Sequence, residues 1–210
     1  MMIKIIEKNK LFFGLYFISF MGVFLLNIHE PLLGATLYFG AHRSAFFDFF
    51  FSYWTLLGEA YPYVLVILFF LFYLKDKQNA TKVAIAGLCV MIFTGVLKEF
   101  FDFPRPALYL ESAGLNIHFA FVPGVEINTG FTSFPSGHTA SAFALWALTA
   151  FQFPQNQKVQ FALFSTAFLV GLSRVYLTQH FPQDTLFGSA IGVVIAVLIE
   201  YYLSKKSLYA

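Results

Sequence analysis

Long apolar segments are the feature that most constrains this chain. Six of them can be delimited, at residues 11–28, 62–74, 81–97, 136–151, 159–172 and 182–203. Hydrophobic residues make up 59% of the sequence and charged residues 11%, whereas soluble domains carry roughly 25% charged residues. A membrane-spanning helix needs about 20 mainly apolar residues. The sequence therefore predicts an all-α fold, a bundle of six transmembrane helices forming one integral membrane domain over residues 1–210.

Charge and cysteine content argue against several other classes of protein. The formal net charge is only +2, and the cations are spread along the chain, so we expect no nucleic-acid partner. Cys89 is the only cysteine, so no intramolecular disulfide can form. Residues 11–28 follow a lysine-bearing N-terminus and could be a secretory signal peptide. Because the run is long for one and no small-x-small cleavage site follows closely, we expect an uncleaved first membrane helix.

Two segments do not have the pattern of spanning helices. Residues 29–61 combine a dense aromatic cluster with the polar residues His42, Arg43, Asp48 and Glu59. This pattern fits amphipathic helices lying at the membrane interface, and it fits a loop packed on the bundle equally well. Residues 102–134 contain three prolines and several glycines and form the longest stretch predicted to be non-helical. Long loops are usually functional, so we expect this one to have a functional role.

The lysines predict how the bundle is oriented. With the N-terminus in the cytoplasm, the cytoplasmic side holds Lys4, Lys8, Lys10, Lys75, Lys77, Lys82, Lys158, Lys205 and Lys206. The opposite side holds only Arg43, Lys98, Arg105 and Arg174. Because short cytoplasmic loops are enriched in Lys and Arg, we expect both termini on the cytoplasmic side of the membrane. Three polar islands, described next, then fall together on the periplasmic or extracellular side.

The first polar island, residues 98–106, presents two cations at a predicted helix end. Pro104 and Pro106 stop the helix and stiffen the turn that carries Arg105. A guanidinium beside the ammonium of Lys98 suits a phosphate group. Taken alone, the island also fits a lysine reaching to the interface and a solvated loop arginine.

The second polar island, residues 134–141, opens a predicted helix. Ser136 is a suitable N-cap, and Gly137 allows the backbone to approach a ligand. The first amides of a helix bind anions, and His138 beside them suits a general acid. The alternative is a capped helix start with an incidental histidine.

The third polar island, residues 171–184, supplies Arg174, His180 and Asp184. Pro182 fits the first position of the last helix, which puts Asp184 in its first turn. Asp184 lies one turn beyond His180, where it can accept a hydrogen bond from one ring nitrogen and leave the other free to attack. A purely structural His–Asp pair is the alternative. A metal site at His138, His180 and Asp184 is also conceivable, but the sequence has no HExxH, CxxC or carboxylate cluster, so none is expected.

Together the islands resemble the three-part signature of the type 2 phosphatidic acid phosphatase family. The matching residues are Lys98-x6-Arg105-Pro106, Pro135-Ser136-Gly137-His138 and Ser173-Arg174-x5-His180-x3-Asp184. The resemblance implies that His180 is a nucleophile forming a phosphohistidine, with Asp184 as its orienting partner and His138 as the acid. It implies a phosphate cradle of Lys98, Arg105, Ser136, Gly137 and Arg174. It implies no metal and no cofactor.

The function implied by this resemblance is metal-independent dephosphorylation of a membrane lipid phosphate or diphosphate. Bacterial members of the family act on undecaprenyl diphosphate, phosphatidylglycerol phosphate, phosphatidic acid or lipid A phosphates. A phosphotransferase using the same phosphohistidine and a non-catalytic lipid-binding or transport protein remain open. Vanadium-dependent haloperoxidases share similar motifs, but they are soluble and the apolar segments here argue against them.

Overall fold

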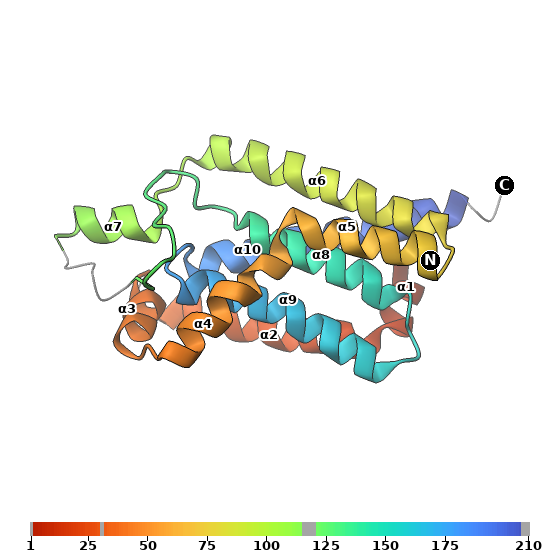
Figure 1. Ribbon diagram of the computed structural model, residues 1–210, viewed down its shortest axis with the longest axis horizontal. Helices are drawn as coiled ribbons and strands as arrows, with labels where there is room; N and C mark the ends of the chain where they lie inside the picture. The colour runs from red at the N-terminus through yellow and green to blue at the C-terminus, as the bar shows by residue number, and fades with distance from the viewer. Residues whose placement is uncertain (1, 30–31, 115–120, 207–210) are drawn as a thin grey trace.

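The computed structural model describes residues 2–29, 32–114 and 121–206 and shows an elongated helical bundle (Figure 1). Its elements are α1 (Met2–Lys8), α2 (Lys10–His29), α3 (Gly34–Ala41), α4 (Ala45–Trp54), the 3-10 helix η1 (Thr55–Gly58), α5 (Ala60–Leu68), the π-helix η2 (Phe69–Tyr73), α6 (Lys77–Phe101), α7 (Pro106–Ser112), α8 (Gly137–Phe151), α9 (Gln157–Tyr176) and α10 (Pro182–Lys206). Within those ranges there is no β-strand, and one isolated bridge joins Phe103 to Thr132. The predicted all-α class is confirmed.

Helix α8 lies at the centre of the bundle and is enclosed by its neighbours. Most of its residues are buried, and many of them are alanines. Gly188 and Gly192 of α10 face it so closely that a Cβ at Gly192 would collide with the carbonyl oxygen of Ala140. Small residues at a contact let two helix backbones approach, which is how membrane helices gain van der Waals packing. This contact fixes the position of α10 along the axis of α8.

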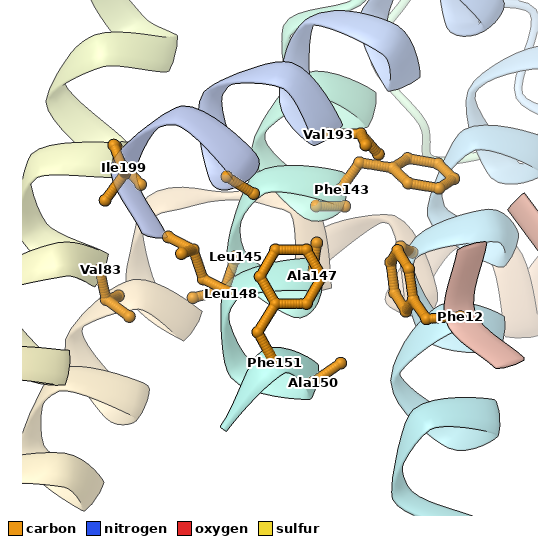
Figure 2. Packing of buried hydrophobic residues seen from close by; sticks show 14 of the residues in the cluster. Phe12, Val83, Phe143, Leu145, Ala147, Leu148, Ala150, Phe151, Val193 and Ile199 are labelled. Atoms are coloured by element: carbon orange, nitrogen blue, oxygen red, sulfur yellow. The ribbon is translucent and has the colours of Figure 1, made fainter. Parts of the chain in front are cut away.

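Aromatic and aliphatic side chains fill the space around α8 further along the bundle. Figure 2 shows part of one buried cluster, in which Phe12 of α2, Val83 of α6 and Val193 of α10 lie on different sides of α8 and its Phe143 and Phe151. The rings of Phe12 and Phe151 meet edge to face, with their centroids 6.0 Å apart. The core thus joins helices from the whole length of the chain.

Length and apolarity single out α2, α6, α9 and α10 as candidate membrane spans among the described residues. A fifth is obtained if Ala45–Gly58 and Ala60–Tyr73, which meet at an angle of 61°, count as one broken span. Helix α8 has only 15 residues. The predicted count of six spans therefore depends on α8 and on the α5–η2 segment, and it stays a prediction.

The structure decides one question that the sequence left open and corrects one prediction. Residues 34–41 and 45–58 are helical, so the loop alternative is wrong for those residues. Its helix α4 is attached to α9, because the hydroxyl of Tyr176 donates to Asp48 Oδ1 at 2.6 Å. The stretch 102–134, predicted to be non-helical, contains α7. Pro106 stands at the start of α7, where a missing N–H costs nothing, so this proline begins a helix as well as ending one.

A buried ion pair ties three helices at the end of the bundle where α6 begins and where α8 and α10 end. Lys82 Nζ of α6 lies 3.0 Å from Glu200 Oε2 of α10 and 2.9 Å from Ser204 Oγ. Gln152, just after α8, donates to the same Glu200 oxygen at 3.1 Å. Removing one partner of such a pair leaves an uncompensated charge, which costs about 3–5 kcal/mol.

We therefore expect Lys82→Met to lower the free energy of unfolding by about 3 kcal/mol. The double variant Lys82→Met, Glu200→Met should recover more than half of that loss, because no isolated charge remains. Thermal unfolding in detergent measures both, with Lys77→Met on the exposed start of α6 as the matched control. A single variant as stable as the wild type would contradict this account.

Candidate active site

The three polar islands converge at the end of the bundle where α6 and α9 end and α8 and α10 begin (Figure 1). The backbone N–H of Ser136 donates to the carbonyl oxygen of Asp184 at 3.0 Å, which joins the second island to the third. Arg105 Nη1 donates to the carbonyl oxygen of Gln179 at 3.1 Å, which joins the first to the third. The cations that were predicted from separate segments are thus brought to one place.

A sharp turn after α9 presents His180. Thr178 has a φ of 59°, an uncommon backbone state for a β-branched residue. The backbone N–H groups of Gln179 and His180 both donate to the carbonyl oxygen of Arg174, at 2.9 and 3.1 Å. The ring of His180 is fully enclosed, with 1% of its side chain exposed.

Asp184 holds the His180 ring through a carboxylate that is itself fixed. Its Oδ2 atom lies 3.3 Å from His180 Nδ1. The same oxygen accepts from the backbone N–H of Phe181 at 2.9 Å and from Ser133 Oγ at 2.5 Å. The contact with Phe181 is an acidic side chain reaching back to the residue before its helix, as in a capping box. Nε2 is therefore the ring nitrogen left for other partners.

The surroundings of His180 keep its imidazole neutral. Burial lowers the pKa of His180 well below its ordinary value, and the positive charges of Arg174, Arg105 and Lys98 lower it further. A hydrogen bond to the backbone of Ser133 opposes them. A neutral imidazole has a free lone pair at physiological pH, which a nucleophile requires.

Three cations surround the ring with few counter-charges. Arg174 Nη1 donates to Thr55 Oγ1 at 2.8 Å, and its Nε is buried with no partner among the described residues. Burial lowers the pKa of Arg105, and Asp184 opposes that effect. Lys98 lies near enough to Arg105 and Arg174 to be repelled by both. Like charges gathered in a partly buried space are costly unless an anion binds between them.

The second island lies on the other side of this space. Ser136 caps α8, with its Oγ accepting from the backbone N–H of Thr139 at 3.4 Å. A Cβ added to Gly137 would lie 3.9 Å from Lys98 Cε, so the first turn of α8 faces that cation. His138 Nε2 lies 3.5 Å from Glu59 Oε1, at the more open edge of the site.

The sequence analysis gave no role in the site to four residues: Thr55, Glu59, Ser133 and Gln179, of which only Gln179 lies inside a polar island. Ser133 stands just before the second island and could have been included by extending it. Glu59 had a stronger signal, because a carboxylate inside an apolar segment is itself a reason to suspect a function. Among the described residues, no group of three His, Cys, Asp or Glu side chains is arranged to hold a metal ion.

An apolar cavity of about 430 Å3 lies behind the site. Its walls come mainly from α2, α3, α9 and α10, and include Phe20, Val23, Phe168 and Leu172. Thr139 and Pro182 also line it, one position after His138 and two positions after His180. The cavity therefore approaches the polar site from the apolar interior of the bundle.

Comparison with known proteins gives a family match over most of the chain. Residues 79–208 match the PAP2 superfamily. The chain is 28% identical over 155 residues to the lipid A 4'-phosphatase of Porphyromonas gingivalis, a match covering 70% of this chain and 60% of that protein. It is 24% identical over 139 residues to the undecaprenyl-diphosphatase BcrC of Bacillus subtilis, covering 66% and 65%. The chain thus spans less than two thirds of each of these relatives.

Solved structures show the same fold. The crystal structure of Aquifex aeolicus LpxE superposes with a TM-score of 0.69 at 27% identity, covering 83% of this chain and 98% of that one. A transmembrane PAP2 type phosphatidylglycerolphosphate phosphatase from Bacillus subtilis gives a TM-score of 0.67 at 22% identity, covering 95% and 97%. The helical arrangement described above is therefore shared with both solved structures.

The cation cluster predicts an anion-dependent stability. Lys98→Met should leave the unfolding temperature unchanged or raise it in the absence of anions, because one repelling charge is removed. The same change should reduce the rise in unfolding temperature caused by millimolar orthophosphate. Thermal unfolding with orthophosphate, and with chloride at equal ionic strength, measures the effect. An undiminished phosphate response would show that Lys98 does not face the bound anion.

Proposed function

Because the chain belongs to the PAP2 superfamily, we propose that it is a phosphatase of membrane lipid phosphates or diphosphates that works through a phosphohistidine. The observation that carries the proposal is the fixed, neutral His180 set among Lys98, Arg105 and Arg174. Residues 1–210 act as one membrane domain of six spans in a bacterial membrane. The lysine distribution supports an orientation in which both termini are cytoplasmic and the site lies at the membrane–water boundary on the periplasmic or extracellular side.

In the first chemical step, His180 Nε2 attacks the phosphorus atom of the lipid phosphate. A nitrogen–phosphorus bond forms, the bond from phosphorus to the lipid oxygen breaks, and His138 gives that oxygen a proton. Asp184, held by Ser133 and Phe181, orients the ring of His180 through Nδ1. It also stabilises the positive charge that the ring acquires when Nε2 bonds to phosphorus. Orientation of this kind makes the attack effectively unimolecular.

In the second step, water attacks the phosphohistidine and His138 takes the proton that water loses. Orthophosphate leaves and both histidines return to their starting forms. Phosphoryl transfer depends mainly on positioning and on neutralising charge on the phosphate oxygens. The cradle of Lys98, Arg105, Ser136, Gly137 and Arg174 provides both, since it combines three cations with the N-terminus of α8.

The substrate class is a phosphate carried on a hydrocarbon chain. The relatives are named for lipid A phosphates, undecaprenyl diphosphate and phosphatidylglycerophosphate, which differ in head group and share long apolar chains. The cavity behind the site is lined by apolar side chains of α2 and α9 and has room for part of such a chain. A lipid could enter sideways from the bilayer while its phosphate reaches the cradle.

The first test is phosphate release by detergent-purified protein in the presence of EDTA. The panel contains undecaprenyl diphosphate, phosphatidic acid, phosphatidylglycerol phosphate and a lipid A phosphate. We expect release from at least one of them in EDTA, and a fall of about 10³-fold or more in His180→Ala, because the nucleophile is lost. Activity that survives in His180→Ala would overturn the phosphohistidine mechanism, and no release by folded wild-type protein would overturn the proposed activity.

The lowered pKa of His180 predicts the acidic side of the pH profile. Protonation abolishes nucleophilicity, and the ring stays unprotonated until the pH falls below its lowered pKa. The acidic limb of kcat/KM that belongs to His180 should therefore lie well below the ordinary histidine value of about 6.5. Arg105→Gln removes one of the charges that lower this pKa. The pKa of His180 should therefore rise and the acidic limb should move to higher pH. The rate should also fall, because a phosphate-binding cation is lost. Comparing the wild type with Arg105→Gln on one substrate cancels the ionisation of the substrate itself. An acidic limb at the same pH in both proteins would contradict its assignment to His180.

A further inference from the structure

Glu59 stands at the mouth of the site, where the mechanism above gives it no part. Its Oε1 atom lies 3.5 Å from His138 Nε2, and the two side chains are 44% and 32% exposed. Asp184, in contrast, is completely buried and faces His180. The site thus has two carboxylates, each beside a different histidine and each with a different access to solvent.

The backbone around Glu59 is held firmly against the site. A Cβ at Gly58 would lie 2.7 Å from the carbonyl oxygen of His138 and 2.7 Å from Val170 Cγ1, so this glycine permits a very close approach to α8 and α9. Trp146 of α8 donates its indole N–H to the carbonyl oxygen of Leu57 at 3.2 Å. Arg174 donates to Thr55. The bend between α4 and α5 is therefore fixed on both sides by helices that carry site residues.

The charges around His138 make a counter-charge necessary. The charged and titratable groups that act on it are Lys98 from α6, Arg105 before α7, Arg174 from α9, His180 before α10 and Glu59 from the bend. Three of the first four are cations, and Glu59 is the one carboxylate among the five. A general acid must nevertheless carry a proton when the bond to the lipid oxygen breaks, because an alkoxide is a very poor leaving group.

We propose that Glu59 is the positioning residue of His138: its carboxylate orients the ring and keeps it protonated until the lipid oxygen takes the proton. This inference rests on the proposed function. As the phosphorus–oxygen bond breaks, His138 gives one ring proton to the lipid oxygen and becomes neutral. It regains a proton from the water that attacks the phosphohistidine, and the imidazolium again lies beside Glu59. Glu59 touches neither phosphorus nor lipid oxygen, so it acts only through His138.

The leaving group separates this role from a merely structural one. p-Nitrophenyl phosphate loses a phenolate that needs no proton at neutral pH, whereas phosphatidic acid loses an alkoxide that does. In Glu59→Gln we expect kcat/KM on phosphatidic acid to fall by about 10-fold or more, a part of the 10²–10⁴-fold that general acids contribute. On p-nitrophenyl phosphate the kcat/KM of Glu59→Gln should stay within about threefold of the wild-type value. The basic limb of the phosphatidic acid profile should also move to lower pH, because the imidazolium loses its counter-charge.

Two further variants complete the experiment. Glu59→Asp retains the charge and should recover most of the activity on phosphatidic acid. Glu111→Gln, an exposed carboxylate on α7, is the matched control and should change neither substrate. Unfolding temperatures of all variants show whether each is folded. If phosphatidic acid is a poor substrate of the wild type, the best lipid monophosphate of the panel replaces it.

Several results would overturn the inference. Equal losses on both substrates, or no loss in Glu59→Gln, would show that Glu59 does not serve the acid. Glu59→Asp as inactive as Glu59→Gln would show that the charge is not what matters. Wild-type protein that releases phosphate from neither class of substrate would overturn the proposed function itself, and this outcome is distinct from a variant-specific loss.

Discussion

The carboxylate of Asp184 is the interaction on which the candidate site depends. One oxygen, Oδ2, lies within hydrogen-bonding distance of the ring of His180, the hydroxyl of Ser133 and the backbone N–H of Phe181. These groups come from the turn after α9, the segment before α8 and the start of α10. A buried carboxylate with three partners has little freedom to move, and breaking any one contact is expensive in a low-dielectric interior. The position of His180 is thus set by two chain segments besides its own.

Helix packing brings the end of α9 and the starts of α8 and α10 to the same end of the bundle. Gly188 and Gly192 allow α10 to lie directly on the backbone of α8, so the starts of both helices meet at one end of the bundle. At the other end, Lys82 and Glu200 fix α6 against α10. In a membrane, where the hydrophobic effect does not drive helices together, close packing and buried polar contacts must supply the alignment. The alignment of Lys98, Arg105 and Arg174 along the bundle axis therefore depends on residues far from these cations.

The two carboxylates divide the electrostatic work of the site in our account. Asp184 is enclosed and acts on the neutral His180, while Glu59 is open to solvent and lies beside His138. Burial and the same three cations act on both histidines. A difference in their chemistry must therefore come from their individual partners, and pairs of titratable groups driven apart in this way are how one site provides both a base and an acid.

The sequence by itself determined the membrane-spanning character, the all-helical class and the residues of the three polar islands. These follow from local features: the length of apolar segments, a proline and a serine at helix starts, and the one-turn spacing of His180 and Asp184. Only the tertiary structure revealed Ser133, Thr55 and Glu59 as neighbours of the site, because their partners lie far along the chain; Ser133 and Asp184, for example, are separated by 51 positions. It also decided that residues 34–41 and 45–58 are helical and that α4 and α5 meet at a bend. Sequence periodicity reports the environment of a residue along its own helix, whereas contacts between helices depend on how closely their backbones approach.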